Sequence, residues 1–165
     1  MTKYRAAILT VSDSVCAGSR VDRSGPAVAE VLEKNGWEIA ERTAVPDEMT
    51  AITSALWELC SRSPALIVTV GGTGLAERDV TPEATRAVIT REITGLAEQM
   101  RRVGTNSTPR AILSRALAGI SGKTIILNLP GSPKGAVESL LSVIGVLEHA
   151  ADLIAGDTQH PENSG

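Results

Sequence analysis

The segment 65-ALIVTVGGTG-74 decides the fold prediction. Ala65 to Val70 form an almost unbroken apolar run, which is typical of a central parallel strand that is covered on both faces. Gly71, Gly72, Thr73 and Gly74 then end the strand in a glycine-rich turn. The segment therefore predicts a buried strand that ends in a turn with exposed backbone N–H groups.

Patterns on either side of this segment predict an alternation of strands and helices. Strands are predicted at residues 4–11, 37–45 and 123–127, and helices at residues 24–35, 46–62 and 134–154. Residues 78–85 lead into a further helix, and helical segments continue to about residue 117, interrupted near residues 104–109. Thr81 is the expected N-cap of its helix, followed by Pro82. The alternation predicts an α/β three-layer sandwich with helices on both faces of the sheet, in which ligands gather at the carboxyl ends of the strands.

The composition narrows the domain organisation and the function class. Residues 1–155 are expected to form one α/β domain, and the polar residues 156–165 a disordered tail. The net charge of −3 argues against general nucleic-acid binding, because affinity for the phosphate backbone needs clustered Lys and Arg. No apolar segment approaches the ~20 residues of a membrane span, so a cytoplasmic protein is expected.

Four arginines are interpreted as solvated or subunit-interface residues: Arg101, Arg102, Arg110 and Arg115.

Three predicted turns follow predicted strands, at residues 12–14, 71–74 and 128–133. If the strands are parallel, these turns lie at the same edge of the sheet. Glycines that leave backbone N–H groups open can cradle phosphate oxygens, although one glycine-rich turn alone is more simply a tight strand exit. The turn matches neither the Walker A motif nor GxGxxG, which disfavours a hydride-transfer enzyme.

Few side chains suit acid–base or nucleophilic catalysis. Cys16 and Cys60 form no CxxC pair, and His149 and His160 lie on the last predicted helix and in the tail. Asp79 is not needed as a helix cap and suits Mg²⁺, which takes one or two carboxylates together with substrate phosphates. Asp47, by position alone, is more simply an N-cap. Phosphoryl or nucleotidyl transfer fits this set, because positioning and charge neutralisation supply most of its catalysis.

Three motifs in one order, 69-TVGGTG-74, 78-RDVTPEAT-85 and 128-NLPGSPK-134, closely resemble the molybdenum-cofactor-biosynthesis family. That family includes the bacterial molybdopterin adenylyltransferases and the amino-terminal domain of gephyrin. The resemblance runs from about Tyr4 to about Ala155 and includes 8-ILTVSDS-14, 22-DRSGP-26, 45-VPDE-48 and 113-LSR-115.

The resemblance implies a mixed, mostly parallel five-stranded sheet, a homotrimer, and a site for molybdopterin and ATP. In the family's adenylyltransferases the terminal phosphate of molybdopterin attacks the α-phosphorus of Mg·ATP and releases pyrophosphate. The adenylylated product goes on to metal insertion, so a downstream molybdenum-insertion protein is a further implied partner.

The resemblance also assigns roles to residues of this chain. Asp47 and Asp79 fall on the family's two catalytic aspartates and are the expected Mg²⁺ ligands. The expected substrate and nucleotide contacts are Ser12, Asp13, Ser14, Ser24, Gly25, Gly71, Gly72, Thr73, Gly74, Pro130, Gly131 and Ser132. Gly104 stands where several members have a serine in the pterin pocket, and a shift of the loop could bring Thr105 or Ser107 into that role.

Two other functions remain open on the sequence. The same fold could hold the pterin as a carrier or scaffold without turnover, and the presence of both aspartates favours turnover over this alternative. A structural trimer that binds no pterin is the second alternative, and the intact phosphate-type loops argue against it.

Overall fold

The computed structural model describes residues 4–157, and these form one mixed sheet covered by helices. The strand order is β2-β1-β3-β6-β5-β4. Four strands are parallel: β1 (Tyr4–Val11), β2 (Trp37–Val45), β3 (Leu66–Val70) and β6 (Thr124–Leu129). β5 (Ala118–Ser121) runs antiparallel to β6, and β4 (Arg91–Glu92) antiparallel to β5. The sheet therefore has one strand more than the expected five, and β4 is only two exposed residues long.

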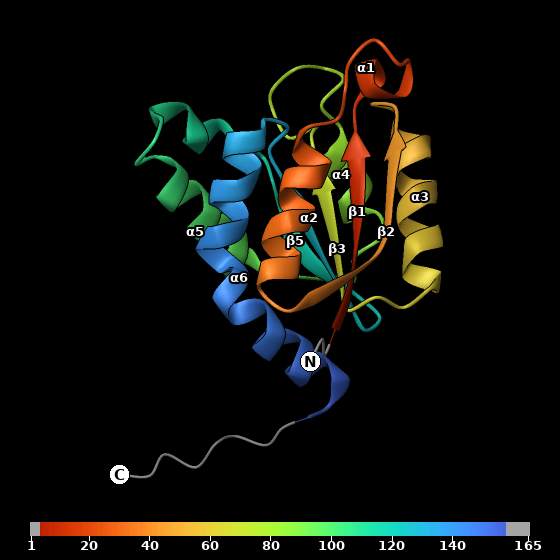
Figure 1. The fold of residues 1–165 in the computed structure, drawn as a ribbon, viewed down its shortest axis with the longest axis vertical. Helices are drawn as coiled ribbons and strands as arrows, with labels where there is room; N and C mark the ends of the chain where they lie inside the picture. The colour runs from red at the N-terminus through yellow and green to blue at the C-terminus, as the bar shows by residue number, and fades with distance from the viewer. Residues whose placement is uncertain (1–3, 158–165) are drawn as a thin grey trace.

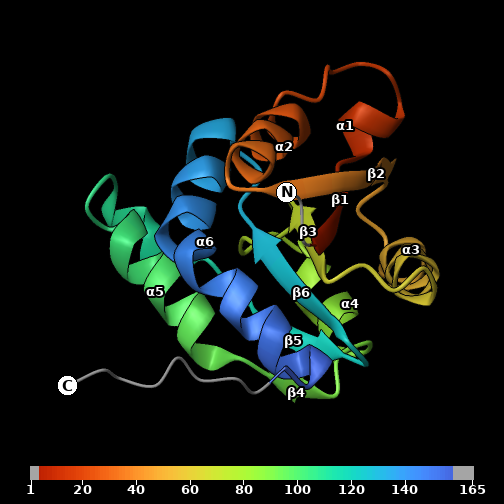
Figure 2. The same ribbon diagram turned by 60° about the horizontal axis from the view of Figure 1, so that its bottom comes forward.

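Helices cover both faces of the sheet, which confirms the three-layer prediction. Figure 2 shows α2 (Ser24–Lys34), α5 (Thr94–Gly104) and α6 (Pro133–Ala155) on one side of the sheet, with α3 (Met49–Ser61) and α4 (Thr81–Arg86) on the other. Two apolar clusters match these two faces, one packed under α2, α5 and α6 and the other under α3 and α4. All residues of β3 and β6 are buried, as the apolar run predicted for β3.

Two short elements complete the chain at the edge where the parallel strands end. The single-turn helix α1 (Asp13–Cys16) follows β1 and lies above the ends of β1 and β2 (Figure 1). The 3-10 helix η1 (Pro109–Leu113) lies between α5 and β5 in sequence. None of the helices within residues 4–157 meets the length and apolarity that crossing a membrane requires.

Several predicted boundaries differ from the structure. α3 begins at Met49 rather than at Pro46, and Asp47 is not its cap. Thr81 is the first residue of α4, not its N-cap, because its hydroxyl donates instead to the carbonyl of Gly71 at 2.9 Å. Residues 114–117 are not helical, and β6 extends to Leu129 instead of ending at Leu127. His149 lies exposed on α6, whereas His160 and residues 158–165 of the predicted tail fall outside the described residues.

Asn128 belongs to β6 and not to the predicted loop, and it joins three parts of the interior. Its side-chain amide donates to the hydroxyls of Thr69 and Thr85, each at 2.9 Å, and its side-chain oxygen accepts from the backbone N–H of Leu117 at 3.3 Å. Asn128 is fully buried, so each of these groups is satisfied inside the protein rather than by solvent.

Asn128→Ala is expected to lower the free energy of unfolding by roughly 3 kcal/mol, because buried polar groups would lose their partners. For a chain of this size that is a fall of about 6–12 °C in the thermal midpoint, measured by circular dichroism. Asn106→Ala, at an exposed position, is the control and should leave the midpoint within about 1 °C. Equal midpoints for the two variants would contradict this account of Asn128.

Candidate active site

The carboxyl ends of β1, β3 and β6 lie side by side. Thr10 pairs with Val70, Val70 pairs with Leu129, and the Gly71 N–H donates to the Leu129 carbonyl at 3.0 Å. The loops that follow these strands therefore leave the sheet at one edge, as predicted from the three turns.

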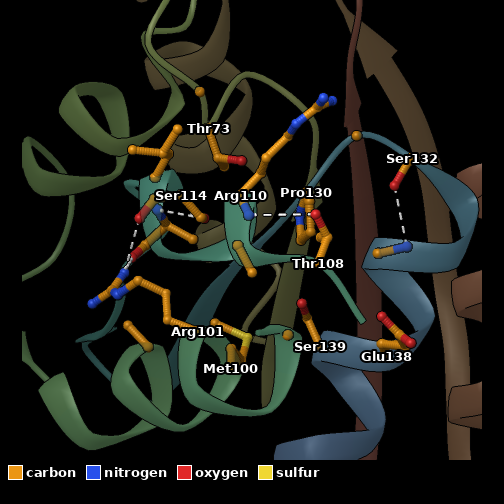
Figure 3. Close-up of a pocket in the computed structure, with 18 of the residues that line it drawn as sticks. Thr73, Met100, Arg101, Thr108, Arg110, Ser114, Pro130, Ser132, Glu138 and Ser139 are labelled. Carbon is orange, nitrogen blue, oxygen red and sulfur yellow. Dashed lines mark hydrogen bonds between the residues drawn. The ribbon is translucent and has the colours of Figure 1, made fainter. Parts of the chain in front are cut away.

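A cavity of about 540 Å³ opens at this edge, a volume suited to a small-molecule ligand. It lies between the loop after β3, α5, η1 and the start of α6. Figure 3 shows Thr73 on one side of the cavity, Met100 and Arg101 of α5 opposite, and Ser139 and Glu138 along α6. The lining is partly apolar (Leu75, Ala97, Met100, Ala111, Leu113, Ala116) and partly polar or charged (Asp79, Arg101, Thr108, Arg110, Ser114, Ser132, Glu138, Ser139).

The loop after β3 differs in how its carbonyls and its N–H groups are paired. The carbonyls of Gly71 and Gly72 accept from the hydroxyl and the N–H of Thr81, at 2.9 and 3.1 Å. By contrast, the N–H groups of Gly72, Thr73, Gly74 and Leu75 have no acceptor among residues 4–157. All four of these residues line the cavity. Such a row of unpaired N–H groups is suited to bind an anion.

Glycine is required at two positions of this loop. Gly71 has φ +107°, and a Cβ there would lie 2.4 Å from the Val11 carbonyl oxygen. Gly72 has φ +68°, and a Cβ there would lie 2.2 Å from the Thr81 hydroxyl. Any side chain would therefore strain the backbone and push β1 or α4 away from the loop.

Asp13 and Asp47 form a reciprocal pair beyond the ends of β1 and β2. The Asp13 N–H donates to the Asp47 carboxylate at 2.8 Å, and the Asp47 N–H donates to the Asp13 carboxylate at 2.9 Å. Arg78 donates two hydrogen bonds to Asp13, at 2.7 and 2.9 Å. Hydrogen bonding to Arg78, with a smaller contribution from the Asp47 N–H, holds the pKa of Asp13 below its usual value.

Asp79 lies on the cavity wall, next in sequence to Arg78, which contacts Asp13. Its carboxylate accepts from the Ala76 N–H at 3.0 Å and lines the cavity wall. The loop of residues 71–79 thus lines the cavity with its glycines and reaches Asp13 through Arg78. Within residues 4–157 no cluster of three or more His, Cys, Asp or Glu could hold a metal ion by itself.

The predicted contact residues divide into two groups. Gly72, Thr73, Gly74, Asp79, Pro130, Gly131 and Ser132 line the cavity, whereas Ser12, Asp13, Ser14, Ser24, Gly25, Asp47 and Gly71 do not. The second group is still joined to the first, because the Ser24 hydroxyl donates to the Gly131 carbonyl at 2.6 Å. The Ser12 hydroxyl accepts from the Val15 N–H and caps α1, and it lies 3.1 Å from the hydroxyl of Ser14.

Gly104 lines the cavity, and the predicted substitutes for a serine there do not. The Thr105 hydroxyl donates to the Arg102 carbonyl, and the Ser107 hydroxyl donates to the Glu138 carboxylate. A Cβ at position 104 would lie 2.8 Å from the Ala111 Cβ, so a serine would require η1 to move. Thr108 is the hydroxyl-bearing residue of this segment that lines the cavity.

The four arginines do not form one solvated group. Arg102 and Arg110 are exposed, but Arg101 is half-buried and donates to the carbonyls of Ser114 and Ala116 at 3.2 and 2.8 Å. Arg115 is also half-buried and donates to the carbonyls of Gly74 and Asp79. No pattern in the sequence indicated these contacts, because their acceptors are backbone carbonyls.

The two thiols take no part in the site as described. Cys16 and Cys60 are both free, and burial raises the pKa of Cys60. Neither lines the cavity.

Comparison with known proteins gives the family of this fold and site. A model described as a probable molybdopterin binding domain matches residues 7–149. The chain belongs to this family. The resemblance to the molybdenum-cofactor-biosynthesis family, predicted from the motifs, is thereby confirmed.

Individual relatives of the family agree along most of the chain. The molybdopterin adenylyltransferase of Helicobacter pylori (strain J99) is 40% identical over 161 residues, which cover 95% of this chain and 91% of that protein. The molybdenum cofactor biosynthesis bifunctional protein of Chlorobaculum tepidum is 36% identical over 153 residues, 93% of this chain, and the chain spans about half (49%) of its length. The structure of the molybdopterin biosynthesis enzyme MoaB from Thermus thermophilus superposes with a TM-score of 0.89 at 52% identity, covering 93% of this chain and 98% of that one.

Thr81→Val is expected to lower the free energy of unfolding by about 1–3 kcal/mol, because the buried Gly71 carbonyl loses the donor that holds it. Thr90→Val is the matched control: its hydroxyl also donates to a backbone carbonyl, that of Ile120, but on the surface, where water can replace it. Urea denaturation should separate the two variants, with the control within about 0.5 kcal/mol of the unmodified protein. A Thr81 variant as stable as the control would rule out a structural role for this hydroxyl.

Arg78→Gln is expected to raise the pKa of Asp13 toward its ordinary value. The folded-state pKa lies below the unfolded one, so the pair stabilises the fold above the unfolded pKa, and this contribution is lost as pH falls through the folded pKa. NMR titration of the Asp13 carboxyl carbon measures the shift, with Arg86→Gln as the control. An unchanged titration in Arg78→Gln would show that Arg78 does not pair with Asp13 in solution.

Proposed function

We propose that this protein is a molybdopterin adenylyltransferase, which transfers AMP from ATP to the terminal phosphate of molybdopterin. The observation that carries the proposal is the loop of residues 71–79. It lines a ligand-sized cavity with unpaired N–H groups and reaches the Asp13–Asp47 pair through Arg78. A phosphate bound by this loop would lie at the border between a pterin site and a nucleotide site.

The cavity supplies the pterin side of the proposed complex. Ala97, Met100 and Ala111 offer apolar surface to a flat ring, and hydroxyls such as those of Thr108 and Ser139 offer hydrogen bonds to its edge. The N–H groups of residues 72–75 would bind the terminal phosphate of molybdopterin. An anionic phosphate is already a nucleophile, which explains how the site can work without a His or Cys base.

The nucleotide would bind on the side of Ser12, Asp13, Ser14, Ser24 and Gly25. A terminal phosphate oxygen of molybdopterin forms a bond to the α-phosphorus, and the bond from the α-phosphorus to the bridging oxygen of pyrophosphate breaks. The electron pair of that bond leaves with pyrophosphate. The chain holds both phosphates in line for this exchange.

Magnesium is the proposed metal, held by Asp47 and Asp79 together with ATP phosphates. Each aspartate has one carboxylate oxygen that accepts from a backbone N–H, and its other oxygen has no hydrogen-bond partner within residues 4–157. Two carboxylates without a third protein ligand suit Mg²⁺, which completes its shell with phosphates and water. When bound, the ion would neutralise charge on the triphosphate.

The name of the Helicobacter pylori relative supports turnover over pterin carriage. By the same family resemblance we propose a homotrimer, with a mass near three times 17.2 kDa, and release of the product to a molybdenum-insertion protein. A reaction that consumes ATP is expected in the cytoplasm.

Asp79→Asn is expected to lower molybdopterin-dependent pyrophosphate release at least about 100-fold while molybdopterin still binds, because the carboxylate is proposed to act on charge and metal. Glu77→Gln makes the same chemical change at an exposed position of the same loop and should keep full activity. Pyrophosphate release from ATP and Mg²⁺, with and without molybdopterin, is the measurement. Full activity in Asp79→Asn would refute the assignment, and pterin binding without release from any of the proteins would make this a carrier.

A further inference from the structure

Arg115 contacts the loop after β3 at three carbonyls. Its backbone N–H donates to the Thr73 carbonyl at 2.8 Å, and its Nε donates to the Gly74 carbonyl at 2.8 Å. One terminal nitrogen donates to the Asp79 carbonyl, and the other pairs with Glu83. A single residue thus holds both the end of the glycine turn and the backbone of Asp79.

These contacts are made from behind the loop. Arg115 does not line the 540 Å³ cavity, although Thr73, Gly74 and Asp79 do. It lines instead a neighbouring cavity of about 340 Å³, which Arg86 and Glu92 also line. Arg115 is therefore placed to act on a ligand only through the loop.

The carbonyl contacts also fix the direction of the N–H group in the same peptide. No peptide bond within residues 4–157 is cis, and in a planar trans peptide the carbonyl of one residue and the N–H of the next point in opposite directions. Because Arg115 draws the carbonyls of Thr73 and Gly74 toward itself, the N–H groups of Gly74 and Leu75 point away from it. Thr81 fixes the N–H groups of Gly72 and Thr73 in the same manner, through the carbonyls of Gly71 and Gly72.

We propose that Arg115 is a positioning residue for anion binding: it aims the N–H groups of Gly74 and Leu75 at the bound phosphate and fixes the backbone of Asp79. This inference rests on the proposed phosphate site of the same loop. Thr81 sets the N–H groups of Gly72 and Thr73, the backbone N–H of Arg115 sets that of Gly74, and the Arg115 side chain sets that of Leu75.

Arginine is suited to this role and lysine is not. The guanidinium is planar and donates in several fixed directions, and here Nε and the two terminal nitrogens serve three different acceptors. A lysine would keep the positive charge but could not reproduce this fork. Arg115→Lys therefore separates positioning from simple attraction between a cation and an anion.

The experiment measures binding of inorganic pyrophosphate by calorimetry to the full chain, with thermal unfolding as the check on folding. Arg115→Lys is expected to bind about ten-fold more weakly than the unmodified protein, since the Leu75 N–H loses its alignment and the Asp79 carbonyl loses its donor. Arg86→Lys, on the same neighbouring cavity, and Glu83→Gln, which removes only the ion pair, should bind within about two-fold. Should Arg115→Lys unfold, Arg115→Ala with added methylguanidinium replaces it, and recovery of binding is then the expected result.

Amide NMR gives a readout that general destabilisation would not produce. Pyrophosphate is expected to shift the amide signals of Gly72, Thr73, Gly74 and Leu75 in the unmodified protein. In Arg115→Lys the shift of Leu75 should be lost, because the side chain that holds the Gly74 carbonyl is changed. The shifts of Gly72, Thr73 and Gly74 should remain, because the Thr73 carbonyl keeps the backbone N–H of residue 115. Equal pyrophosphate affinity, or a preserved Leu75 shift, overturns the role of the Arg115 side chain.

The outcomes for Arg115 and for the proposed function can be told apart. Pyrophosphate binding that depends on Arg115, in a protein without adenylyl transfer, supports the positioning role and refutes the enzyme assignment. Adenylyl transfer that is intact in Arg115→Lys refutes only the positioning role. An unmodified protein that binds no pyrophosphate overturns the phosphate site and the role of Arg115 together.

Discussion

The parallel pairing of β1, β3 and β6 is the constraint on which the site depends. Their registers place Thr10 beside Val70 and Val70 beside Leu129, so that three loops leave the sheet together. β3 and β6 are buried on both faces, and a shift of register by one residue would exchange the side chains that meet each helix layer. The hydrophobic core therefore fixes the spacing of the loops, and the loops themselves are free to carry polar groups.

The loop after β3 is held in place by hydrogen bonds from two other parts of the chain. The carbonyls of its four residues 71–74 accept from Thr81 of α4 and from Arg115 before β5, whereas the N–H groups of residues 72–75 have no acceptor among residues 4–157. Loops with open N–H groups bind anions best when they need no rearrangement. Arg78 of the same loop bonds Asp13, which pairs with Asp47, so one loop connects the cavity with the acidic pair.

The sequence predicted the parts of the fold that have a local signal. The apolar runs of β1 and β3 and the glycine turn could be read directly. Asp79 was singled out by its position and Asp47 by the motif resemblance, and the roles of both stay predictions. β4 and β5 were not predicted individually, because two exposed residues and the short segment AGIS carry no period. Thr81 looked like an N-cap, but a tertiary contact ten residues away takes its hydroxyl. The cavity wall on α5 and η1, including Arg101, has no motif, because its polar contacts go to backbone carbonyls distant in sequence.

Following the label of ATP into the pterin product tests the central claim most directly. The purified protein would be incubated with molybdopterin, Mg²⁺ and ATP labelled with phosphorus-32 at either the α- or the γ-phosphate, and the pterin product isolated. The account predicts label in the pterin from α-labelled ATP and none from γ-labelled ATP, because AMP is the group transferred. Label from the γ-phosphate would mean phosphoryl transfer, and no label from either would mean that the site binds without turnover. Both results would contradict the account.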